Sequence, residues 1–518
     1  MQRSLLYPLC MKKLILVLIA LLGYIDLFSQ SKEDNIWVLG YPPNDSANSY
    51  GGTILEFGGP DPIVRFFNAE AFLENSAEIS SFEGNLLFYS NGCRVINSNH
   101  QQMVEGDQIN PGTVHDNQCN EGDVYRTHQG LIALPWPGRD GEYAMFHLGW
   151  YRTTGWPPRQ YIRDIYVTHI DMNANNGLGK VLEKNTVLWQ DSTLVDNMTA
   201  VRHGNGRDWW IVEPRGLTDS FYLFLLSPYG IKGPFIEKTG LRSTVSGLTA
   251  GQVVFSPDGT KYIRGNGRDG IDIFDFDRCR GKFVRGQRLP FPSVASDGVC
   301  GAAISPSSRY LYISALTKMF QYDLWAEDIE HSKVLLGQYD GFVDPFPTTF
   351  YQQMLAPNGK IYMTSTNGTR YLHVIHYPDS AGLSCAFEQR GLRLATYHGF
   401  CVPNFPHFRL YDLPASPCDS LGIDAPEEYR VLWSPSDGIR LLPNPVGSGT
   451  VTVTIPPGDG GVLRVFDAAG RFLAEYKVAH ERLYTLDCSD FPNGVYVVTF
   501  STAESRRPMV ARLVVVQK

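Results

Sequence analysis

The sequence VVFSPDGTKYI at residues 253–263 returns twice further along the chain, as AISPSSRYLYI at residues 303–313 and as MLAPNGKIYM at residues 354–363. Each copy has a short apolar run, a turn that contains proline, and an alternating run with a central tyrosine, which is the pattern of a β-hairpin. The proline of the turn recurs at intervals of 49 and 51 residues. A fixed period of about 40 to 50 residues is typical of propeller blades.

A second pair of strands follows each hairpin, for example GIDIFDF at residues 270–276 and MFQYDL at residues 319–324. Four strands make one blade, and because a single sheet cannot bury both of its faces, such blades stack around a channel. We therefore predict an all-β fold with a seven-bladed β-propeller over residues 30–413; six or eight blades would also fit. The units begin near Glu78, Gln129, Thr199, Gly251, Gly301 and Tyr351, and residues 400–410 with residues 36–57 supply the seventh.

The first residues have the pattern of a secretory signal peptide. Lys12 and Lys13 precede an apolar run over residues 14–22, which is too short to span a membrane. We expect residues 1–29 to be removed and the protein to be exported through the periplasm. The net charge of the chain is −8 and no basic cluster is present, so nucleic acid is not an expected partner.

Nine cysteines are present, and eight of them follow the signal peptide. An even number in an oxidising compartment permits disulfides, whereas the absence of any C-x-x-C spacing argues against zinc. The sequence favours the two local pairs Cys93–Cys119 and Cys279–Cys300.

The pattern changes after residue 413. Residues 414–437 are rich in proline and serine and lack periodicity, so we predict a linker. Residues 438–518 contain several short alternating segments separated by Gly-containing turns. That spacing predicts a small Ig-like β-sandwich.

Four ordered motifs in this C-terminal region resemble the type A C-terminal sorting domain of the type IX (Por) secretion system. They contain Pro443, Asn444 and Pro445; Gly470 and Arg471; Asn493, Gly494 and Tyr496; and a closing run that ends at Lys518. Leu442 stands where the family usually has an aromatic residue. The resemblance implies recognition by the type IX machinery, transport across the outer membrane, and removal of the domain, with the cargo attached to surface lipopolysaccharide or released. An Ig-like module without a sorting role is the alternative.

The propeller region is similar to uncharacterised N-terminal regions of such cargo, and this likeness assigns no chemistry. One candidate site is Asp171-x-Asn173-x-Asn175, which resembles a calcium loop with oxygen ligands at alternate positions. The glycine comes one place late and no glutamate stands at the twelfth position. A hairpin turn with positive φ angles accounts for the same residues, so calcium is an alternative here.

Other candidate residues each have a structural interpretation beside the functional one. The loop from His115 to His128 could hold a metal, and Asp272, Asp275 and Asp277 could perform acid and base chemistry on a sugar. His398 or His407 with Cys401 could form a nucleophile pair, although core packing and a disulfide at Cys401 explain them too. Five tryptophans could stack on sugars or pack in the core: Trp136, Trp150, Trp156, Trp209 and Trp210.

We find no motif of a known catalytic family in the chain. The expected function is that of a secreted or surface-attached cargo whose propeller binds a glycan or a protein as an adhesion module. A polysaccharide hydrolase or lyase with its site at the channel is the first alternative. A structural surface protein is the second.

Overall fold

The computed structural model divides the chain into two compact units, residues 1–228 with 234–419, and residues 229–233 with 420–518. It describes residues 31–42, 50–69, 73, 76–119, 125, 127–153, 160–247, 251–291, 298–413, 416–418, 431–433, 439–442, 446, 449–455, 460–468, 470–479, 483–502 and 509–516. The predicted signal peptide at residues 1–29 lies outside these residues. Within them, no helix is long and apolar enough to cross a membrane.

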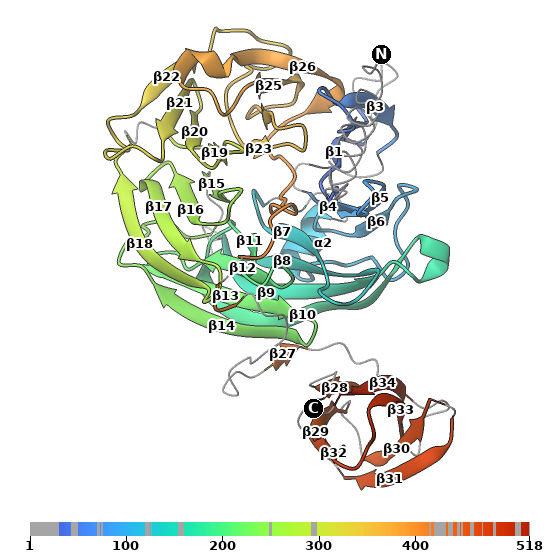
Figure 1. Ribbon diagram of the computed structural model, residues 1–518. Coiled ribbons are helices and arrows are strands. Elements are labelled where there is room, and N and C mark those ends of the chain that lie inside the picture. The colour runs from blue at the N-terminus through green and yellow to red at the C-terminus, as the bar shows by residue number, and fades with distance from the viewer. Residues whose placement is uncertain are drawn as a thin grey trace, which may run out of the picture. The chain divides into compact units, whose positions relative to one another are not determined.

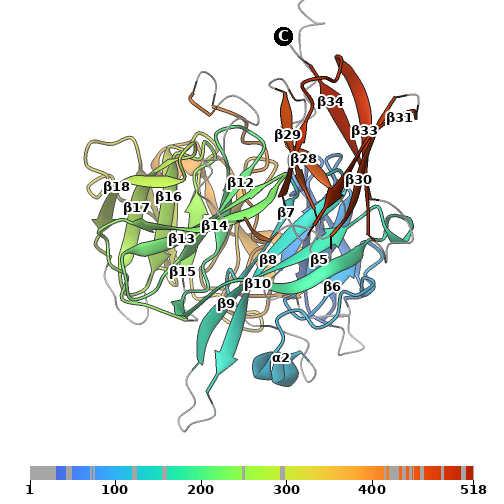
Figure 2. The same cartoon turned by 90° about the horizontal axis from the view of Figure 1, so that it is seen from below.

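The described residues of the first unit form seven antiparallel sheets, which lie around a central axis in Figure 1. Two sheets have three strands: β1 (Ile36–Gly40), β2 (Gly52–Glu56) and β3 (Ile63–Phe67); and β4 (Ala77–Ser80), β5 (Leu86–Ser90) and β6 (Val95–Asn97). The third sheet consists of β7 (Leu131–Pro135) and the long strands β8 (Glu142–Arg152), β9 (Gln160–Asp171) and β10 (Lys180–Leu194), which Figure 2 shows from below.

Four further sheets follow in chain order. Their strands are β11 (Thr199–Arg202), β12 (Trp209–Pro214), β13 (Ser220–Ser227) and β14 (Gly230–Lys238); β15 (Gly251–Phe255), β16 (Lys261–Asn266), β17 (Gly270–Asp277) and β18 (Lys282–Leu289); β19 (Gly301–Ile304), β20 (Tyr310–Ala315), β21 (Lys318–Asp323) and β22 (Val334–Gln338); and β23 (Gln353–Leu355), β24 (Ile361–Met363), β25 (Thr369–Ile375) and β26 (Phe387–His398). Helical structure in the described part of the ring is confined to α2 (Thr113–Gln118) and two short 3-10 turns, η1 (Asn175–Gly177) and η2 (Gly382–Cys385).

The three copies of the sequence repeat form the first hairpins of the last three sheets, as predicted. In the first copy, the turn between β15 and β16 closes with a hydrogen bond from the Gly259 amide to the Ser256 carbonyl, 2.7 Å long. Gly259 has a φ of +70°, which a residue with a side chain rarely adopts. The central tyrosines of the three copies, Tyr262, Tyr312 and Tyr362, are all buried. The central tyrosine of each copy is therefore a core position of the ring.

The apolar core of the ring is divided among the spaces between neighbouring sheets. One cluster joins the β11–β14 and β15–β18 sheets, and others lie between the next two pairs of sheets and between the first two sheets. The β15–β18 and β19–β22 sheets therefore bury both faces against their two neighbours. This explains why the strands contain many consecutive buried residues, for example all six residues of β20.

The expected mixed sheet made from both ends of the chain does not form. The first sheet contains β1, β2 and β3 alone, and residues 400–410 form no strand. Pro403 and Pro406 lack the N–H groups that a strand ladder needs, and Phe400 has a φ of +66°. The first and last sheets instead meet through side chains. The hydroxyls of Thr53 and Thr396 are 2.9 Å apart, and the Gly40 amide donates to Nδ1 of His398 over 3.1 Å.

After β26 the chain runs across the ring as an irregular segment, which we call the strap (residues 399–418, of which 414 and 415 lie outside the described residues). Its orange trace passes through the middle of the ring in Figure 1. Asn404 donates to the carbonyl oxygens of Leu131 and Met198 over 2.8 and 2.9 Å, and Nε2 of His407 donates to the Phe255 carbonyl over 2.9 Å. The strap therefore bonds three consecutive sheets that are far from it in the sequence.

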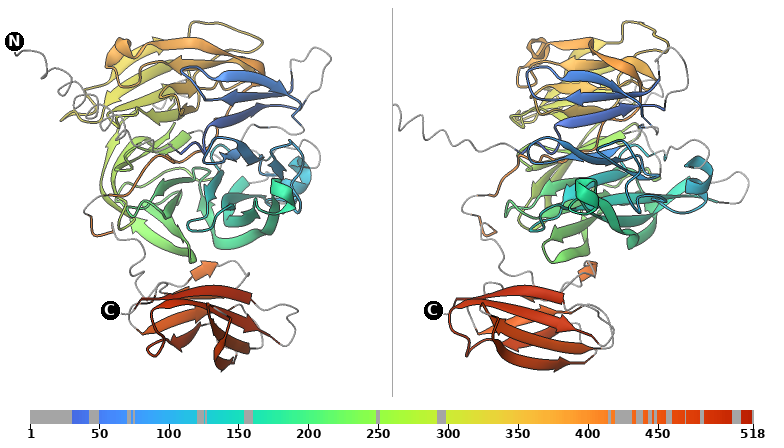
Figure 3. Two further views of the ribbon diagram at one scale, coloured as in Figure 1. Left: turned by 45° about the vertical axis from the view of Figure 1, so that its right-hand side comes forward. Right: turned by 90° about the vertical axis from the view of Figure 1, so that its right-hand side faces the viewer.

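The second unit contains two antiparallel sheets that share one apolar core (Figure 3). The first sheet consists of β28 (Arg440–Leu442), β29 (Thr450–Thr454) and β32 (Leu483–Asp487). The second has the order β31 (Phe472–Val478), β30 (Gly461–Asp467), β33 (Gly494–Ser501) and β34 (Met509–Val515), and a short strand β27 (Val431–Trp433) precedes both sheets. Val453 and Leu486 from one sheet and Val465, Val498 and Leu513 from the other are fully buried. The alternating segments of the sequence predicted these strands.

Candidate functional site

Buried amide side chains cross-link the inner strands of the ring. Gln252 on β15 donates to the carbonyl of Gln353 over 2.6 Å and accepts from the amides of Gln353 and Ala302, each over 3.0 Å. Gln129, just before β7, makes the same kind of paired contact with the backbone of Val253, with both distances 2.9 Å. These side chains pair with backbone groups as a neighbouring strand would. The strap adds Asn404, whose Oδ1 accepts from Gln129 over 3.1 Å.

The sequence contained a signal for this network that our prediction did not use. Gln252 and Gln352 both stand five residues before the proline of their repeat. Both are buried in the structure. A polar residue that recurs at one place in two of the three repeats indicates a recurring contact position within the ring, and the identity of its partner depends on how the sheets are arranged.

Ionisable side chains gather where the inner strands begin, beside the channel that a propeller is predicted to have, and we call this mostly buried group the channel mouth (His128, Asp196, Cys300, Tyr351 and Cys401). Nδ1 of His128 is 2.7 Å from Oδ2 of Asp196, which also accepts the backbone amide of His128 over 3.0 Å. Asp196 is completely buried, whereas 25% of the His128 side chain is exposed. A buried carboxylate at Nδ1 favours a proton on that nitrogen and orients the ring.

Tyr351 completes the polar part of the channel mouth. Its ring centroid lies 6.1 Å from that of His128. Burial raises the pKa of Tyr351 well above that of an ordinary tyrosine, and the nearby groups Cys401, Cys300 and Asp196 act in the same direction. The phenol is therefore neutral and can donate a hydrogen bond. An oriented imidazole beside a neutral phenol can bind a polar ligand or move a proton.

Two buried glutamates lie beside the inner strands. Glu78 accepts a hydrogen bond from the Val38 amide over 3.0 Å, and Glu213 accepts one from the Val195 amide over 3.2 Å. The second carboxyl oxygen of each residue has no hydrogen-bond partner within the described structure. Burial raises the pKa of both side chains well above the usual range of glutamate. Burial therefore favours the neutral carboxylic acid form of both side chains.

Burial shifts the pKa of three histidines downward, opposite to its effect on the two glutamates. Burial lowers the pKa of His147 and His373 to about 3 and that of His398 to about 4. His147 lies between Asn110 Oδ1, at 2.6 Å, and Thr168 Oγ1, at 2.9 Å. These contacts suit a neutral ring.

The free energy of unfolding is expected to be greatest near pH 6.5. Below the ordinary histidine pKa of 6.5, the three histidines take up protons only in the unfolded chain, and each lowers stability by about 1.4 kcal/mol per pH unit. Above the ordinary glutamate pKa of 4.5, Glu78 and Glu213 ionise only in the unfolded chain, so stability falls as the pH rises toward their raised pKa values. The histidines outweigh the two glutamates where both act. Urea unfolding of the ring from pH 5 to 8 measures this profile.

Glu213→Gln is the variant that separates the two effects, because glutamine keeps the acceptor for Val195 and cannot ionise. We expect it to make the decline above pH 6.5 shallower, and the rise in stability between pH 5 and 6.5 steeper, each by about 1.4 kcal/mol per pH unit. An unaltered slope above pH 6.5 would show that Glu213 is already ionised in the folded ring.

The residues of the possible calcium loop form a tight turn between β9 and β10. Asp171 Oδ1 accepts the amide of Asn173 over 2.8 Å, and the Asn173 side chain donates to the Asp140 carbonyl over 2.8 Å. Asn175, in η1, has a φ of +52°. These contacts are the ones expected if the residues form a hairpin turn rather than a calcium loop. Across the described residues, no three His, Cys, Asp or Glu side chains are arranged to hold a metal ion. Calcium binding at Asp171, Asn173 and Asn175 stays a prediction.

The three aspartates of the predicted acid and base set do not converge. Asp272 is buried and forms ion pairs with Arg264 and Arg288, both 2.6 Å long. Asp275 pairs with Lys261 over 2.8 Å. The Asp277 carboxylate accepts the amide of Cys279 in a turn. Each carboxylate is therefore engaged with a different partner, and the set offers no shared site for a sugar.

His398 and His407, which could have formed a nucleophile pair with Cys401, both hydrogen-bond backbone carbonyls in the structure. Nε2 of His398 donates to the backbone carbonyl of Cys401 over 2.8 Å, and its other nitrogen accepts from Gly40. The Cys401 thiol points to the Thr127 carbonyl at 3.8 Å, and this cysteine forms no disulfide. His115 likewise bonds a backbone carbonyl, that of Ile109, over 2.8 Å. Residues 120–124 and 126 of the loop between His115 and His128 lie outside the described residues.

One predicted disulfide is confirmed and the other is wrong. Cys93 and Cys119 are bonded, but Cys279 pairs with Cys418, 139 residues further along the chain. Cys300 is buried as a free thiol. Cys418 falls in the predicted linker, yet it is bonded to the ring. The tryptophans Trp136, Trp150, Trp209 and Trp210 are buried in the core, and Trp156 lies outside the described residues.

The motif residues of the second unit lie at two turns. Gly470 has a φ of +79° between β30 and β31, and Arg471 Nε pairs with Asp467 over 2.6 Å. At the second turn, Asn493 and Gly494 lead into β33, and the Tyr496 hydroxyl donates to the Pro492 carbonyl over 2.6 Å. Pro443, Asn444, Pro445 and Lys518 lie outside the described residues.

The C-terminal residues match a known family. Residues 440–516 match the family described as the secretion system C-terminal sorting domain, and this match spans β28 to β34 with both turns. Residues 440–516 are a type IX secretion sorting domain. This domain implies that the chain is cargo of the type IX machinery and is exported across the outer membrane to the cell surface or the extracellular space.

Three solved structures illustrate the wider similarity. A putative 6-phosphogluconolactonase from Bacteroides uniformis is 14% identical, with 71% of this chain and 98% of that chain covered and a TM-score of 0.41. A protein from Lactobacillus plantarum is 11% identical, with the same coverage and a TM-score of 0.42. PorZ, a surface component of the type IX secretion system of Porphyromonas gingivalis, is 12% identical over 90% of this chain and 68% of that chain, with a TM-score of 0.27. No curated protein matches the sequence. Identities this low assign no activity to the ring.

Proposed function

We propose that the ring domain is a seven-bladed β-propeller that acts as a binding or adhesion module, carried outward by an Ig-like sorting domain. Seven sheets around a common axis support the blade count. After export the mature protein is attached to surface lipopolysaccharide or released, and its ring meets a glycan or protein ligand. Calcium at the Asp171 turn belongs to the same proposal as a possible cofactor.

The observation that carries the binding role is an exposed and firmly anchored loop between β22 and β23. We call residues 340–347 the apolar loop. Phe342, Val343 and Phe346 are 38, 56 and 51% exposed. Large apolar side chains gathered on one surface loop are unfavourable in water and commonly mark an interaction site.

Contacts with the last sheet hold the apolar loop in place. Arg390 on β26 makes two hydrogen bonds to the Asp340 carboxylate, 3.1 and 2.6 Å long, and its guanidinium lies 4.4 Å from the ring centroid of Phe342. Tyr371 contacts the edge of the same phenylalanine at 5.9 Å. Because these contacts order the loop before a partner arrives, binding would cost little conformational entropy.

The experiment compares the exported wild-type protein with the double variant Phe342→Ser and Phe346→Ser, on glycan arrays and on immobilised extracellular proteins. Both proteins are tested with calcium and with chelator. We expect the double variant to lose at least tenfold in affinity for the ligand that the wild type binds, because two apolar contacts are removed. Val284→Ser, which changes a 70% exposed residue on β18, is the matched control. Equal affinity of the double variant and the control would place the binding surface elsewhere.

A polysaccharide hydrolase or lyase is the second candidate, because His128 and Asp196 form an oriented pair at the channel mouth. In such an enzyme, His128 would act as the general base or general acid that accepts or donates the proton transferred in the reaction. Wild-type protein that degrades an acidic or neutral polysaccharide, with His128→Asn lowering kcat at least a hundredfold, would establish the enzyme. A structural surface protein, the third candidate, predicts neither binding nor turnover.

A further inference from the structure

Two arginines of the ring donate hydrogen bonds to backbone carbonyls of the strap. Arg202 donates to the Phe408 carbonyl over 3.3 Å, and Arg278 donates to the Tyr411 carbonyl over 2.6 Å. Arg278 is buried, and Arg202 lies 4.1 Å from the ring centroid of Trp209. In the reverse direction, Arg409 of the strap pairs with the buried carboxylate of Asp34 near the start of the ring. Charged groups buried in this way fix the path of the strap.

Glycines in two ring turns make room for the strap. A Cβ atom added to Gly206 would lie 2.7 Å from the backbone nitrogen of Asp412, and one added to Gly259 would lie 2.8 Å from Leu410. A Cβ at Gly204 would lie 2.3 Å from the sulfur of Cys418. Three ring positions therefore accept the strap only because they lack a side chain. We call the ring surface that contacts the strap the strap seat, and it fits the strap closely.

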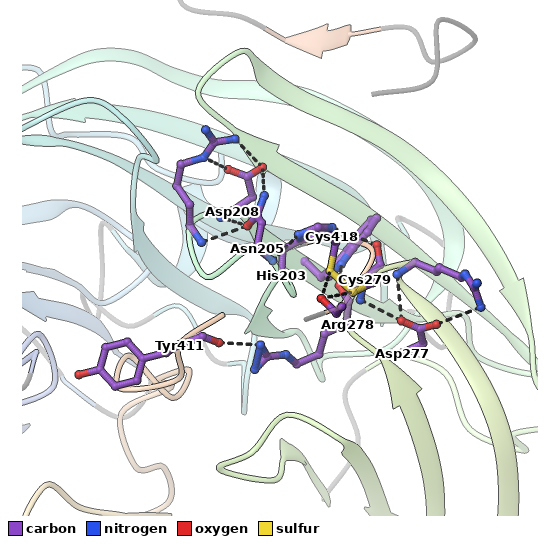
Figure 4. The surroundings of a disulfide bond; sticks show 12 residues. His203, Asn205, Asp208, Asp277, Arg278, Cys279, Tyr411 and Cys418 are labelled. Carbon is purple, nitrogen blue, oxygen red and sulfur yellow. Dashed lines mark hydrogen bonds and ion pairs between the residues drawn. A yellow bond between two sulfur atoms is a disulfide. The ribbon is translucent and has the colours of Figure 1, made fainter. Parts of the chain in front are cut away.

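The Cys279–Cys418 disulfide closes the end of this seat (Figure 4). Cys279 lies in the turn between β17 and β18, where its carbonyl accepts a hydrogen bond from Nε2 of His203 over 3.0 Å. On the strap side, the Leu413 amide donates to the Gly204 carbonyl over 2.8 Å. Figure 4 shows Arg278 reaching Tyr411 beside the two sulfurs. The ring turns thus place the two cysteines together once the strap is seated.

We propose that the strap is an oxidation-dependent lock of the ring, closed by the Cys279–Cys418 disulfide after the chain leaves the cytoplasm. Thiols stay reduced in the cytoplasm and are oxidised after export. The disulfide holds the strap across the ring. Changes in the chain beyond Cys418, including removal of the sorting domain, then leave the ring structure unaltered. The ring then keeps its closed form as an independent module.

Closure proceeds by thiol–disulfide exchange with an external disulfide, supplied by a disulfide oxidoreductase or by oxidised glutathione. The thiolate of one cysteine attacks the external disulfide, forms a mixed disulfide and releases one thiolate. The second cysteine thiolate then attacks the mixed disulfide and releases the other thiolate. The two cysteines lose two electrons, the external disulfide gains them, and the released thiolates take up the two protons.

Hydrogen exchange of the full-length protein tests the lock. We expect peptides covering residues 405–413 to exchange at least tenfold faster after reduction with dithiothreitol, because the strap can then leave its seat. The double variant Cys279→Ser and Cys418→Ser should show the same increase without reductant. Cys93→Ser with Cys119→Ser, which removes the local disulfide, is the matched control and should leave this exchange within twofold of wild type. Unchanged exchange in both the reduced protein and the first double variant would overturn the proposal.

A glycine variant tests the seat without altering a cysteine. Gly206→Ala pushes a methyl group against the strap, so we expect at least a threefold larger fraction of unpaired Cys279 and Cys418 in thiol labelling after export. Gly58→Ala is the control, because an added Cβ there meets no atom within 4 Å. Complete disulfide formation in Gly206→Ala would show that the cysteines pair without a correctly seated strap, which contradicts the proposed order of events.

Discussion

A chain that ends at Asp437 should be absent from the cell surface and the medium. This truncation removes residues 440–516, which form both sheets of the sorting domain and match the secretion system C-terminal sorting family. The two domains have separate cores, so the ring is expected to fold and to accumulate inside the cell envelope. We expect surface exposure and secretion, measured by protease shaving and by immunoblotting of the medium, to fall at least a hundredfold.

Arg464→Ala is the control for this truncation. Arg464 lies on β30 and makes a partly exposed ion pair with Glu475, 2.8 Å long, and surface ion pairs contribute little to stability. This variant should reach the surface at wild-type levels. Truncated protein that still appears at the surface in normal amounts would mean that the ring carries its own export signal.

Removal of the Cys279–Cys418 disulfide should lower the free energy of unfolding of the ring by about 5 kcal/mol, because the bond spans 139 residues and restricts the unfolded chain over that length. Removal of Cys93–Cys119, which spans 26 residues, should cost about 3.5 kcal/mol. Urea unfolding followed by the fluorescence of the buried tryptophans measures both values.

Comparing the two serine double variants shows whether the long-range disulfide acts mainly on the unfolded state. If the long-range bond acts mainly on the unfolded state, its removal costs more than removal of the local bond. A smaller loss for Cys279→Ser with Cys418→Ser would mean that the strap contacts already restrict the chain and that the disulfide adds little to global stability. The exchange experiment on residues 405–413 would still distinguish local opening of the strap from global unfolding.

The hairpins and the sorting domain were predictable because their signals are local. Asp258 and Gly259 specify a turn whose closing contact is made within a few residues, and the segments on either side of it form the largely buried strands β15 and β16. The motifs around Gly470 and Asn493 similarly lie at turns of the second unit. Local turn chemistry and strand periodicity act over fewer than about ten residues, so they can be read from the sequence.

The candidate site was not predictable in the same way. His128 precedes β7, and Asp196 lies 68 residues away between β10 and β11, so their contact exists only when the neighbouring sheets are in place. The same is true of Gln252 and Gln353, which are separated by 101 residues. Their residue types suggested polar positions on inner strands, but neither sequence spacing nor composition identifies a partner on another sheet.

Local patterns in the sequence specify the repeated hairpins and the division into a ring and a sorting domain. How the ring closes depends on tertiary contacts. The Thr53 and Thr396 hydroxyls meet although 343 residues separate them in the sequence. Pro403 and Pro406 prevent the strap from forming a strand, and the strap crosses the ring instead. Tertiary contacts also decide that Cys279 bonds Cys418 rather than Cys300. The physical reason is that periodicity constrains neighbours along the chain, whereas closure depends on which surfaces meet after all the sheets have packed.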